Sequence, residues 1–462
     1  MALNDQIARN WRELEWHSLG QTGRADTLNS LTVSLADRFW ETGDIADLDE
    51  AIALGRSALE LCGPASHPGR PMSLCLLSRC LQLRYHEQVM LLDLQEATTF
   101  AQAALALCSP GHPNRSNSLH ELACCFTIQY DKGTSIADLE EAIALNRAAL
   151  ELRPLGHSLR SDTLHNLGNN LRCRYSQLGL NADLEKALLL HRSALDLRPA
   201  GHRNRSCSLH ELTACFSSRY DKRGTILDLA EAIILGRTAL ELRPPGHSGR
   251  ASTLHNLGND LKRRFLQFDV NADIEEAFSL HRSVLDLRPA RHPDRSNSVH
   301  ELAACFSNRY DKRASIVADL ETAITLGQTA LELRPPGHSG RAATLHNLGN
   351  DLKRRYLKLG ANADLESAVL LHRSALDLRP AGHPYRSRSL YELAVCFGTR
   401  YERQANLEDL EEAIILGRAS LELRPFGHPR RAATLHNLGH DLRLRFVELG
   451  ANTDLEEAIS LN

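Results

Sequence analysis

Apolar residues recur along this chain with helical spacing, and the pattern repeats about every 45 residues. Within residues 157–199, a first run has apolar residues at steps of three, four and four: Leu164, Leu167, Leu171 and Tyr175. These steps place the four side chains on one face of a helix, which we call helix A. A second amphipathic run, helix B, begins at Asp183 and ends at Pro199, because proline cannot continue the hydrogen-bond ladder.

The repeat extends over nearly the whole chain. Its clearest marker is the alanine of Asp-Leu-x-x-Ala (Asp-Ile in one repeat), at spacings of 45 or 46 residues: Ala51, Ala97, Ala142, Ala187, Ala232, Ala277, Ala323, Ala368, Ala413 and Ala458. A period of this length indicates stacked helix pairs that pack mainly on their neighbours, rather than one closed core. We predict a degenerate half-repeat in residues 1–19 and tandem repeats in residues 20–462, the last of them truncated.

Two segments of the repeat resemble tetratricopeptide repeats: Ala187-x3-His191-x2-Ala194-x4-Pro199 in helix B and Leu167-Gly168 in helix A. The repeats here are about eleven residues longer than the usual 34, which is similar to the repeats of kinesin light chains. The string Asp-Leu-Glu-Glu-Ala-Ile…Leu-Arg-Pro-x-Gly-His looks like the arrays of mushroom-forming fungi, many of which precede a caspase-like CHAT domain. The resemblance implies an all-α, right-handed superhelical solenoid of about ten tetratricopeptide-like helix pairs.

The start of helix B has a recurrent acidic pattern. Aspartate stands there in all ten repeats, from Asp47 to Asp454, and glutamate follows three residues later in seven of them. This spacing predicts a capping box, in which the aspartate accepts from a free backbone amide and the glutamate reaches back. Both acids also suit the positive end of the helix dipole, so their recurrence requires no catalytic explanation.

Composition narrows the class of protein. The chain is 42% hydrophobic and carries a formal charge of −3, which gives no general electrostatic case for nucleic acid or an anionic membrane. We expect no transmembrane helix and no signal peptide, and therefore a cytoplasmic protein. The eleven cysteines contain no Cys-x-x-Cys pair. Four of them lie two repeats apart and are expected to be reduced, buried packing residues: Cys125, Cys215, Cys305 and Cys396.

Nine histidines occupy the loop after helix B, and an arginine follows each of them three residues later, as Arg205 follows His202. One interpretation is a row of anion sites. The favoured interpretation is structural, with the ring packed in the loop and the arginine bound to backbone carbonyls at the end of the helix. A role that every repeat needs is more often structural.

Catalytic and metal-binding patterns are weak. His436 and His440 share one helix face, but two ligands are too few for a metal site. His120 and Cys125 are five residues apart, about 140° around the helix, so they do not form a nucleophilic pair. We therefore expect no enzyme activity, no catalytic residue, no metal and no cofactor.

Alternate repeats differ, which gives a second period of about 90 residues. One type has His-Asn-Leu-Gly in helix A, and the other has glutamate at the asparagine position, which argues against nucleic acid. In tetratricopeptide folds helix A lines the concave groove, where asparagine suits an extended peptide because its amide both donates and accepts. The candidate groove residues are His165, Asn166, Asn169, His255, Asn256, Asn259, Lys262, Arg263, His346, Asn347, Asn350, Lys353, Arg354, His436 and Asn437.

Two functional hypotheses follow, and the oligomeric state stays open. The first is a non-enzymatic scaffold that binds an extended peptide or partner helix on its concave face. The alternative is the sensing or regulatory arm of a larger signalling protein with a caspase-like effector domain beyond residue 462. The asparagines also have a structural interpretation, in which they cap helices, pair between helices or face water.

Overall fold

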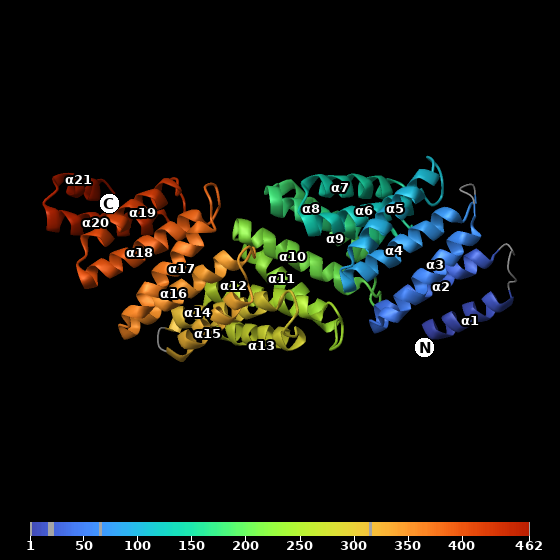
Figure 1. The fold of residues 1–462 in the computed structure, drawn as a ribbon, viewed down its shortest axis with the longest axis horizontal. Coiled ribbons are helices and arrows are strands. Elements are labelled where there is room, and N and C mark those ends of the chain that lie inside the picture. Colours follow the sequence, from blue (N-terminus) through green and yellow to red (C-terminus); the bar gives the residue numbers. More distant parts are fainter. Residues whose placement is uncertain (1, 17–22, 64–66, 314–316, 462) are drawn as a thin grey trace. The chain divides into compact units, whose positions relative to one another are not determined.

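The computed structural model describes residues 2–16, 23–63, 67–313 and 317–461, and all regular secondary structure in these residues is α-helical. The helices A are α2 (Arg24–Thr42), α4 (Arg70–Gln88), α6 (Arg115–Gly133), α8 (Arg160–Leu178), α10 (Arg205–Arg223), α12 (Arg250–Phe268), α14 (Arg295–Arg313), α16 (Arg341–Leu359), α18 (Arg386–Gln404) and α20 (Arg431–Leu449). The helices B are α3 (Ile45–Leu61), α5 (Leu91–Leu107), α7 (Ile136–Glu151), α9 (Asn181–Asp196), α11 (Ile226–Glu241), α13 (Asn271–Leu287), α15 (Val317–Glu332), α17 (Asn362–Asp377), α19 (Leu407–Glu422) and α21 (Asn452–Leu461). One further helix, α1 (Ala2–Trp16), precedes them (Figure 1). The predicted all-α solenoid of helix pairs is confirmed.

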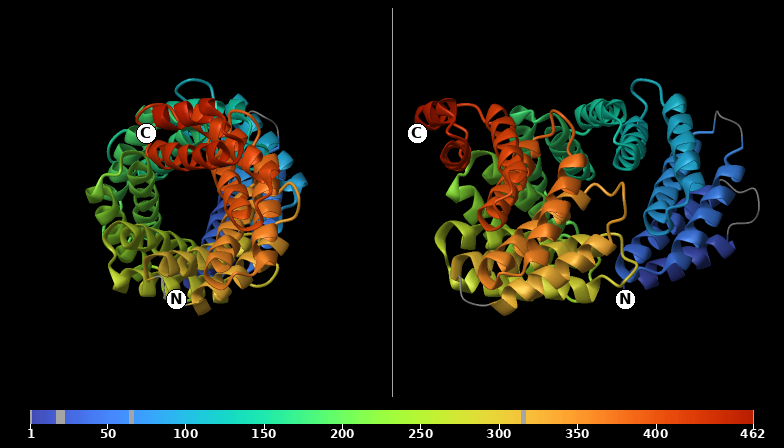
Figure 2. Two further views of the ribbon diagram at one scale, coloured as in Figure 1. Left: turned by 90° about the vertical axis from the view of Figure 1, so that its left-hand side faces the viewer. Right: turned by 60° about the vertical axis from the view of Figure 1, so that its left-hand side comes forward.

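The chain divides into two compact units, Met1–Ala239 and Leu240–Asn462. In each unit a helix A packs against the helix B that follows it, and that helix B packs against the next helix A, as α4, α5 and α6 do (Figures 1 and 2). Consecutive helices A also contact each other, whereas consecutive helices B do not, within the described residues. The helices A therefore form the more closely spaced layer of each unit.

The helix α1 packs against α2. The predicted boundary between residues 19 and 20 lies outside the described residues. The degenerate half-repeat in residues 1–19 and the truncation of the last repeat therefore stay predictions.

The core of each repeat lies between helix A and helix B. Leu164, Leu167 and Leu171 are at most 4% exposed, as their helical spacing predicts. The marker alanines are fully buried in nine repeats, and Ala458 is 5% exposed. A larger side chain at these positions would push the two helices apart, because protein interiors have no room for extra methylene groups. The four cysteines that follow the repeat are free and buried, which confirms their interpretation as packing residues.

Helix B begins two residues before the recurrent aspartate, so the predicted capping box is wrong. In α9 the aspartate Asp183 is the third residue of the helix, and Leu180 holds the N-cap position. Asp183 instead accepts two hydrogen bonds from Arg174 of helix A, from Nε at 2.7 Å and from Nη2 at 2.9 Å. Two parallel bonds from one guanidinium to one carboxylate are among the strongest polar contacts in proteins.

This bidentate pair recurs in nine of the ten repeats: Arg38–Asp47, Arg84–Asp93, Arg174–Asp183, Arg219–Asp228, Arg264–Asp273, Arg309–Asp319, Arg355–Asp364, Arg400–Asp409 and Arg445–Asp454. In the remaining repeat Gln129 stands where the arginine would be, and Asp138 has no arginine opposite it. The Asp183 side chain is only 5% exposed, against 19% for Arg174, so solvent screens the pair little. The pair fixes helix B against helix A next to the tight turn that joins them.

The loop after helix B confirms the structural interpretation of the histidine and arginine pattern. Nδ1 of His202 accepts a hydrogen bond from the backbone amide of Asn204 at 3.1 Å. Nη1 of Arg205 donates to the carbonyl oxygen of Arg198 at 2.5 Å, at the end of helix B. The ring thus shapes the loop, and the arginine satisfies a carbonyl that the helix leaves unpaired.

A second arginine, in the recurrent Leu-Arg-Pro string, is buried, and sequence reasoning missed it. Arg198 is 1% exposed, and its Nη1 donates to the Ser208 hydroxyl of the next helix A at 2.7 Å. Its Nη2 donates to Asp162 of the preceding helix A at 2.7 Å. The equivalent arginines are Arg153, Arg243, Arg288, Arg334, Arg379 and Arg424. These contacts offset the cost of burying a charge and join consecutive repeats.

We expect Arg174→Ala to lower the free energy of unfolding by about 2–3 kcal/mol, because it leaves the buried carboxylate of Asp183 without a partner. Urea denaturation followed by circular dichroism measures this change. Arg192→Ala, which removes an exposed arginine from α9, is the matched control and is expected to have little effect. In the repeat without the pair, Gln129→Arg is expected to raise stability. Equal unfolding midpoints for Arg174→Ala and Arg192→Ala would contradict the structural role of the pair.

Candidate functional site

The candidate groove residues all lie on four helices A: α8 in the first unit, and α12, α16 and α20 in the second. They differ strongly in exposure. His436 is exposed, whereas His346 and Asn350 are buried, at 2% and 7% exposure. The four asparagines of the His-Asn-Leu-Gly string are half-buried in every case: Asn166, Asn256, Asn347 and Asn437. Only part of the predicted set is therefore accessible to a ligand.

The first histidine of the string packs against a second histidine from helix B. The rings of His165 and His191 are edge to face with their centroids 5.5 Å apart, and the equivalent distances are 5.6 Å for His255–His281 and 5.3 Å for His346–His372. Each histidine of helix B is fully buried, and neither ring nitrogen has a hydrogen-bond partner among the described residues. Burial lowers the pKa of these three imidazoles to about 3, so they are neutral at pH 7.

The asparagine one turn later completes this arrangement. Nδ2 of Asn169 donates to Nε2 of His165 at 3.2 Å, and the pairs Asn259–His255 and Asn350–His346 have the same distance. The amide therefore holds the ring in one orientation against helix B. These asparagines thus bond within helix A, and the histidines pack against helix B.

The glycine of the string makes room for the histidine of helix B. A Cβ atom on Gly168 would lie 2.7 Å from the His191 ring, and one on Gly258 or Gly349 would lie 2.8 Å from the equivalent ring. In most alternate repeats helix B has glycine where the histidine would stand, and a Cβ on Gly327 would lie 3.2 Å from Leu348 of the next helix A. The two repeat types thus differ in the size of the residue at this position of helix B.

The basic residues of the candidate groove are already paired. Nζ of Lys353 donates to Glu392 in the next helix A at 2.7 Å, and Lys262 contacts Glu301 in the same way. Arg354 pairs with Asp351 at 2.7 Å. The glutamate of one repeat type is therefore neutralised by the cation of the preceding repeat. This contact joins two helices A and leaves little charge for a ligand.

The first unit contains the same charge pair. Nη2 of Arg172 donates to Glu211 of the next helix A at 3.1 Å. Burial alone would raise the pKa of Glu211, but Arg172 and nearby histidines bring it down to about 2. Glu211 is thus ionised in its buried position. Sequence reasoning missed these pairs, although the cation and the glutamate stand 39 residues apart each time: Arg172–Glu211, Lys262–Glu301 and Lys353–Glu392.

The half-buried asparagines use their donor groups and keep their acceptors. Nδ2 of Asn437 donates to the Tyr391 hydroxyl at 3.0 Å, and Nδ2 of Asn166 donates to Sγ of Cys124 at 3.2 Å. Nδ2 of Asn347 lies 3.5 Å from Nε2 of His300. Within the described residues the Oδ1 atoms of these asparagines accept no hydrogen bond. Each asparagine thus presents a carbonyl acceptor on the layer of helices A.

The described residues also bear on metal sites and on membrane spans. Within them, no three histidine, cysteine, aspartate or glutamate side chains gather as metal ligands would. No described helix combines the length and the apolar character that a membrane span needs.

Comparisons with known proteins bear on the fold. Residues 341–385 match the family model of the tetratricopeptide repeat. No curated protein matches the chain. Residues 341–385 are thus similar to one tetratricopeptide repeat, and their residue pattern recurs along the chain.

Several solved structures are similar. The apo form of the quorum sensor NprR from B. thuringiensis is 14% identical with a TM-score of 0.55, over 87% of this chain and 98% of that one. A putative kinesin light chain from Podosopora anserina, with nearly identical TPR-like repeats, is 22% identical with a TM-score of 0.34, over 48% and 98%. The human IFIT1 dimer with PPP-AAAA is 15% identical with a TM-score of 0.44, over 96% and 94%. The likeness to NprR supports the solenoid fold.

The close contact between Gly168 and His191 predicts that helix α8 has no room for a larger residue at this position. We expect Gly168→Ala to destabilise the protein by about 1–3 kcal/mol through overpacking, although alanine is the better helix former. The double variant Gly168→Ala/His191→Ala should lose less stability than the two single changes summed, because the smaller side chain removes the clash. Denaturant unfolding of the four proteins measures this coupling.

Gly439 provides the matched control for this series. It holds the same position in α20, but among the described residues its Cβ would meet only the carbonyl oxygen of Ala458, at 3.8 Å. Gly439→Ala is therefore expected to leave stability unchanged or raise it. An equal loss of stability for Gly168→Ala and Gly439→Ala would rule out the histidine as the cause.

The buried histidines predict a loss of stability in mild acid. Their pKa is lowered in the folded protein, against about 6.5 in the unfolded chain, so the unfolded chain binds more protons below that pH. The free energy of unfolding should fall as the pH drops from about 6.5 toward 3, by about 2 kcal/mol per histidine at pH 5. Asp351 and Asp441 act in the opposite direction, because burial raises their pKa to about 6 and about 7.

A triple variant tests this assignment. His191→Asn/His281→Asn/His372→Asn should flatten the pH dependence of unfolding between pH 7 and 5, because asparagine does not titrate. Asparagine is a fitting replacement, since Asn146 occupies the same position, fully buried, in another repeat. His436→Asn changes an exposed histidine and should leave the pH profile as it is. An unchanged slope in the triple variant would mean that other groups cause the acid sensitivity.

Proposed function

We propose that this array of tetratricopeptide repeats is a protein-interaction scaffold whose layer of helices A binds an extended peptide. The observation that carries the proposal is the series of half-buried asparagines in the second unit, Asn256, Asn347 and Asn437. They recur every two repeats on the layer of helices A. The Oδ1 atoms of Asn347 and Asn437 accept no hydrogen bond within the described residues. A peptide backbone offers amide donors at regular intervals, which suits such a series of acceptors.

Contacts between neighbouring helices support this arrangement. The donor group of Asn437 is held by the Tyr391 hydroxyl, and that of Asn347 lies near His300. Each amide is thus oriented before a ligand arrives, which lowers the entropy lost on binding. In the first unit, the contact of Asn166 with Cys124 gives the same arrangement on α8.

The charge pairs limit the kind of peptide. Lys262 and Lys353 are bound to glutamates of the next helix A, and Arg354 is bound to aspartates. These cations therefore contribute to packing between repeats. We assign peptide recognition to the neutral amides, so affinity should depend only weakly on salt concentration.

The experiment starts from a peptide selected with the full chain from a random display library. We expect the triple variant Asn256→Ala/Asn347→Ala/Asn437→Ala to raise the Kd for that peptide at least about tenfold, which corresponds to the loss of one to three hydrogen bonds. Fluorescence anisotropy measures the Kd, and circular dichroism should show the same helix content in both proteins.

Three exposed asparagines at the starts of helices B give a matched control: Asn271, Asn362 and Asn452. Their replacement by alanine should leave the Kd unchanged, because these positions lie outside the layer of helices A. An unchanged Kd in the helix A variant, or an equal loss in the control, would refute the asparagine series as the binding surface.

The alternative role, as the regulatory arm of a protein with a caspase-like effector, stays a prediction. It concerns chain beyond residue 462, so the sequence of the gene past that point tests it directly.

A further inference from the structure

Helix α4 departs from the rest of the array where other helices A carry a cation. In α8, α12 and α16 this position holds Arg172, Lys262 or Lys353, each paired with the glutamate of the next helix A. In α4 it holds Gln82, which is neutral. The glutamate opposite it, Glu121, has only the Gln82 amide at 3.4 Å.

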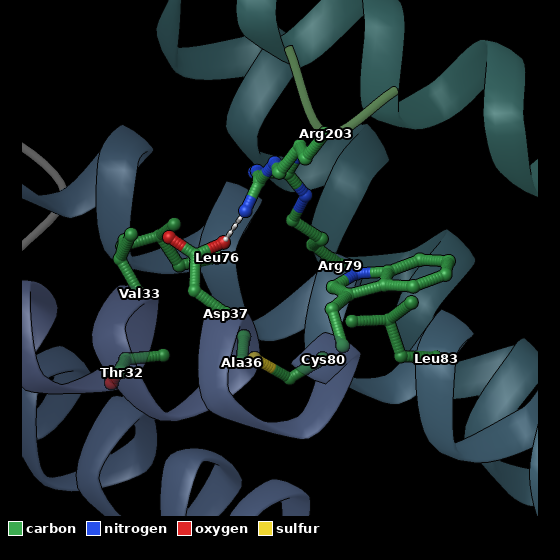
Figure 3. A pocket seen from close by; sticks show the side chains of 10 residues that line it. Thr32, Val33, Ala36, Asp37, Leu76, Arg79, Cys80, Leu83 and Arg203 are labelled. Atoms are coloured by element: carbon green, nitrogen blue, oxygen red, sulfur yellow. Dashed lines mark hydrogen bonds and ion pairs between the residues drawn. The ribbon is translucent and has the colours of Figure 1, made fainter. Parts of the chain in front are cut away.

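A displaced cation stands one turn earlier, at Arg79. Its guanidinium makes no hydrogen bond or ion pair within the described residues, although the field of Glu121 raises its pKa. Asp37 is near it but is already paired, at 2.7 Å, with Arg203 from the loop before α10 (Figure 3). Arg79 and Glu121 are therefore opposite charges on facing helices without direct contact.

Both charges line a cavity of about 150 Å³ between α4 and α6. Cavities of about this size hold a benzene-sized molecule. Met72, Leu76 and Leu159 give the cavity an apolar part of its lining. The space thus has a cation, an anion and a hydrocarbon surface.

The other polar groups of the cavity are accounted for. Arg153 donates to the Thr163 hydroxyl at 2.5 Å and to Asn117 at 2.7 Å, and Asp162 accepts from Arg198 at 2.7 Å. His120 is neutral, because burial lowers its pKa to about 3. Within the described residues, Arg79 and Glu121 are the charges of the cavity that have no counterion in contact, and Glu121 has the neutral Gln82 amide.

We infer that this cavity binds a free aliphatic α-amino acid, with the carboxylate on Arg79 and the ammonium group on Glu121. A guanidinium is the best protein partner for a carboxylate, since two parallel hydrogen bonds form. A buried carboxylate gains equally from an ammonium donor, and the net charge of the cavity does not change. The side chain of the amino acid would lie against Met72, Leu76 and Leu159. The site goes beyond the peptide groove proposed above and uses none of its residues.

Isothermal titration calorimetry of the full chain with L-valine tests the inference. We expect saturable binding at one site per chain. N-acetyl-L-valine lacks the ammonium group and L-valinamide lacks the carboxylate, so each should bind at least about tenfold more weakly. Absence of saturable binding at millimolar L-valine, or equal binding of all three compounds, would overturn the proposal.

Variants locate the site. Arg79→Gln and Glu121→Gln should each weaken L-valine binding at least about tenfold, whereas Arg147→Gln, which removes an exposed arginine from α7, should not. Gln82→Lys restores the cation of the other repeats, so its ammonium group should pair with Glu121 as Lys353 pairs with Glu392. This variant should keep or raise the unfolding midpoint and lose L-valine binding.

The outcomes separate this site from the peptide groove. The variant Asn256→Ala/Asn347→Ala/Asn437→Ala should bind L-valine normally, and Arg79→Gln should bind the selected peptide normally. L-valine binding that survives both Arg79→Gln and Gln82→Lys would place the ligand elsewhere and refute the assignment.

Discussion

The bidentate ion pair between an arginine of helix A and an aspartate of helix B is the contact on which the geometry of nine of the ten repeats depends. In Arg174–Asp183 it acts beside the short turn, and the fully buried alanine of helix B allows the close approach of the two helices further along. A polar clamp at one end and a small residue in the middle fix both the angle and the distance of the pair. Because nine repeats share the clamp, the stack is regular enough to align side chains from repeat to repeat.

Residues outside this arginine–aspartate pair make the contacts between repeats. The buried arginine of Leu-Arg-Pro, as in Arg198, joins a helix B to the helices A before and after it. The pair Lys353–Glu392 joins two consecutive helices A. Both contacts lie on the side where helices A meet, so they stabilise the layer on which we place the peptide groove. The asparagines of that layer can remain half-exposed because these charged residues stabilise the contacts between repeats.

The fold was predictable from sequence because its signal is local and repeated. The alanine spacing and the apolar steps around Leu167 define helix pairs without knowledge of their arrangement. The candidate site was only partly predictable, because polar residues with the same spacing can either line a groove or pack between helices. His165, Asn166 and Asn169 are close together on helix A, but only the structure shows that His165 packs against His191 and that Asn169 bonds His165. The capping box failed for a similar reason, because an acidic residue near a helix start satisfies either a backbone amide or an arginine nine residues earlier.

The alternation of the two repeat types limits how the array can change its length. A helix A with Gly349 is followed by a helix B with His372, and the cation Lys353 requires a glutamate in the helix A that comes next. Removing a single repeat would set the cation of one string opposite an asparagine and leave a buried charge without its counterion. Removing two adjacent repeats keeps every such junction intact. The array can therefore gain or lose two repeats at a time, which changes its length by about 90 residues.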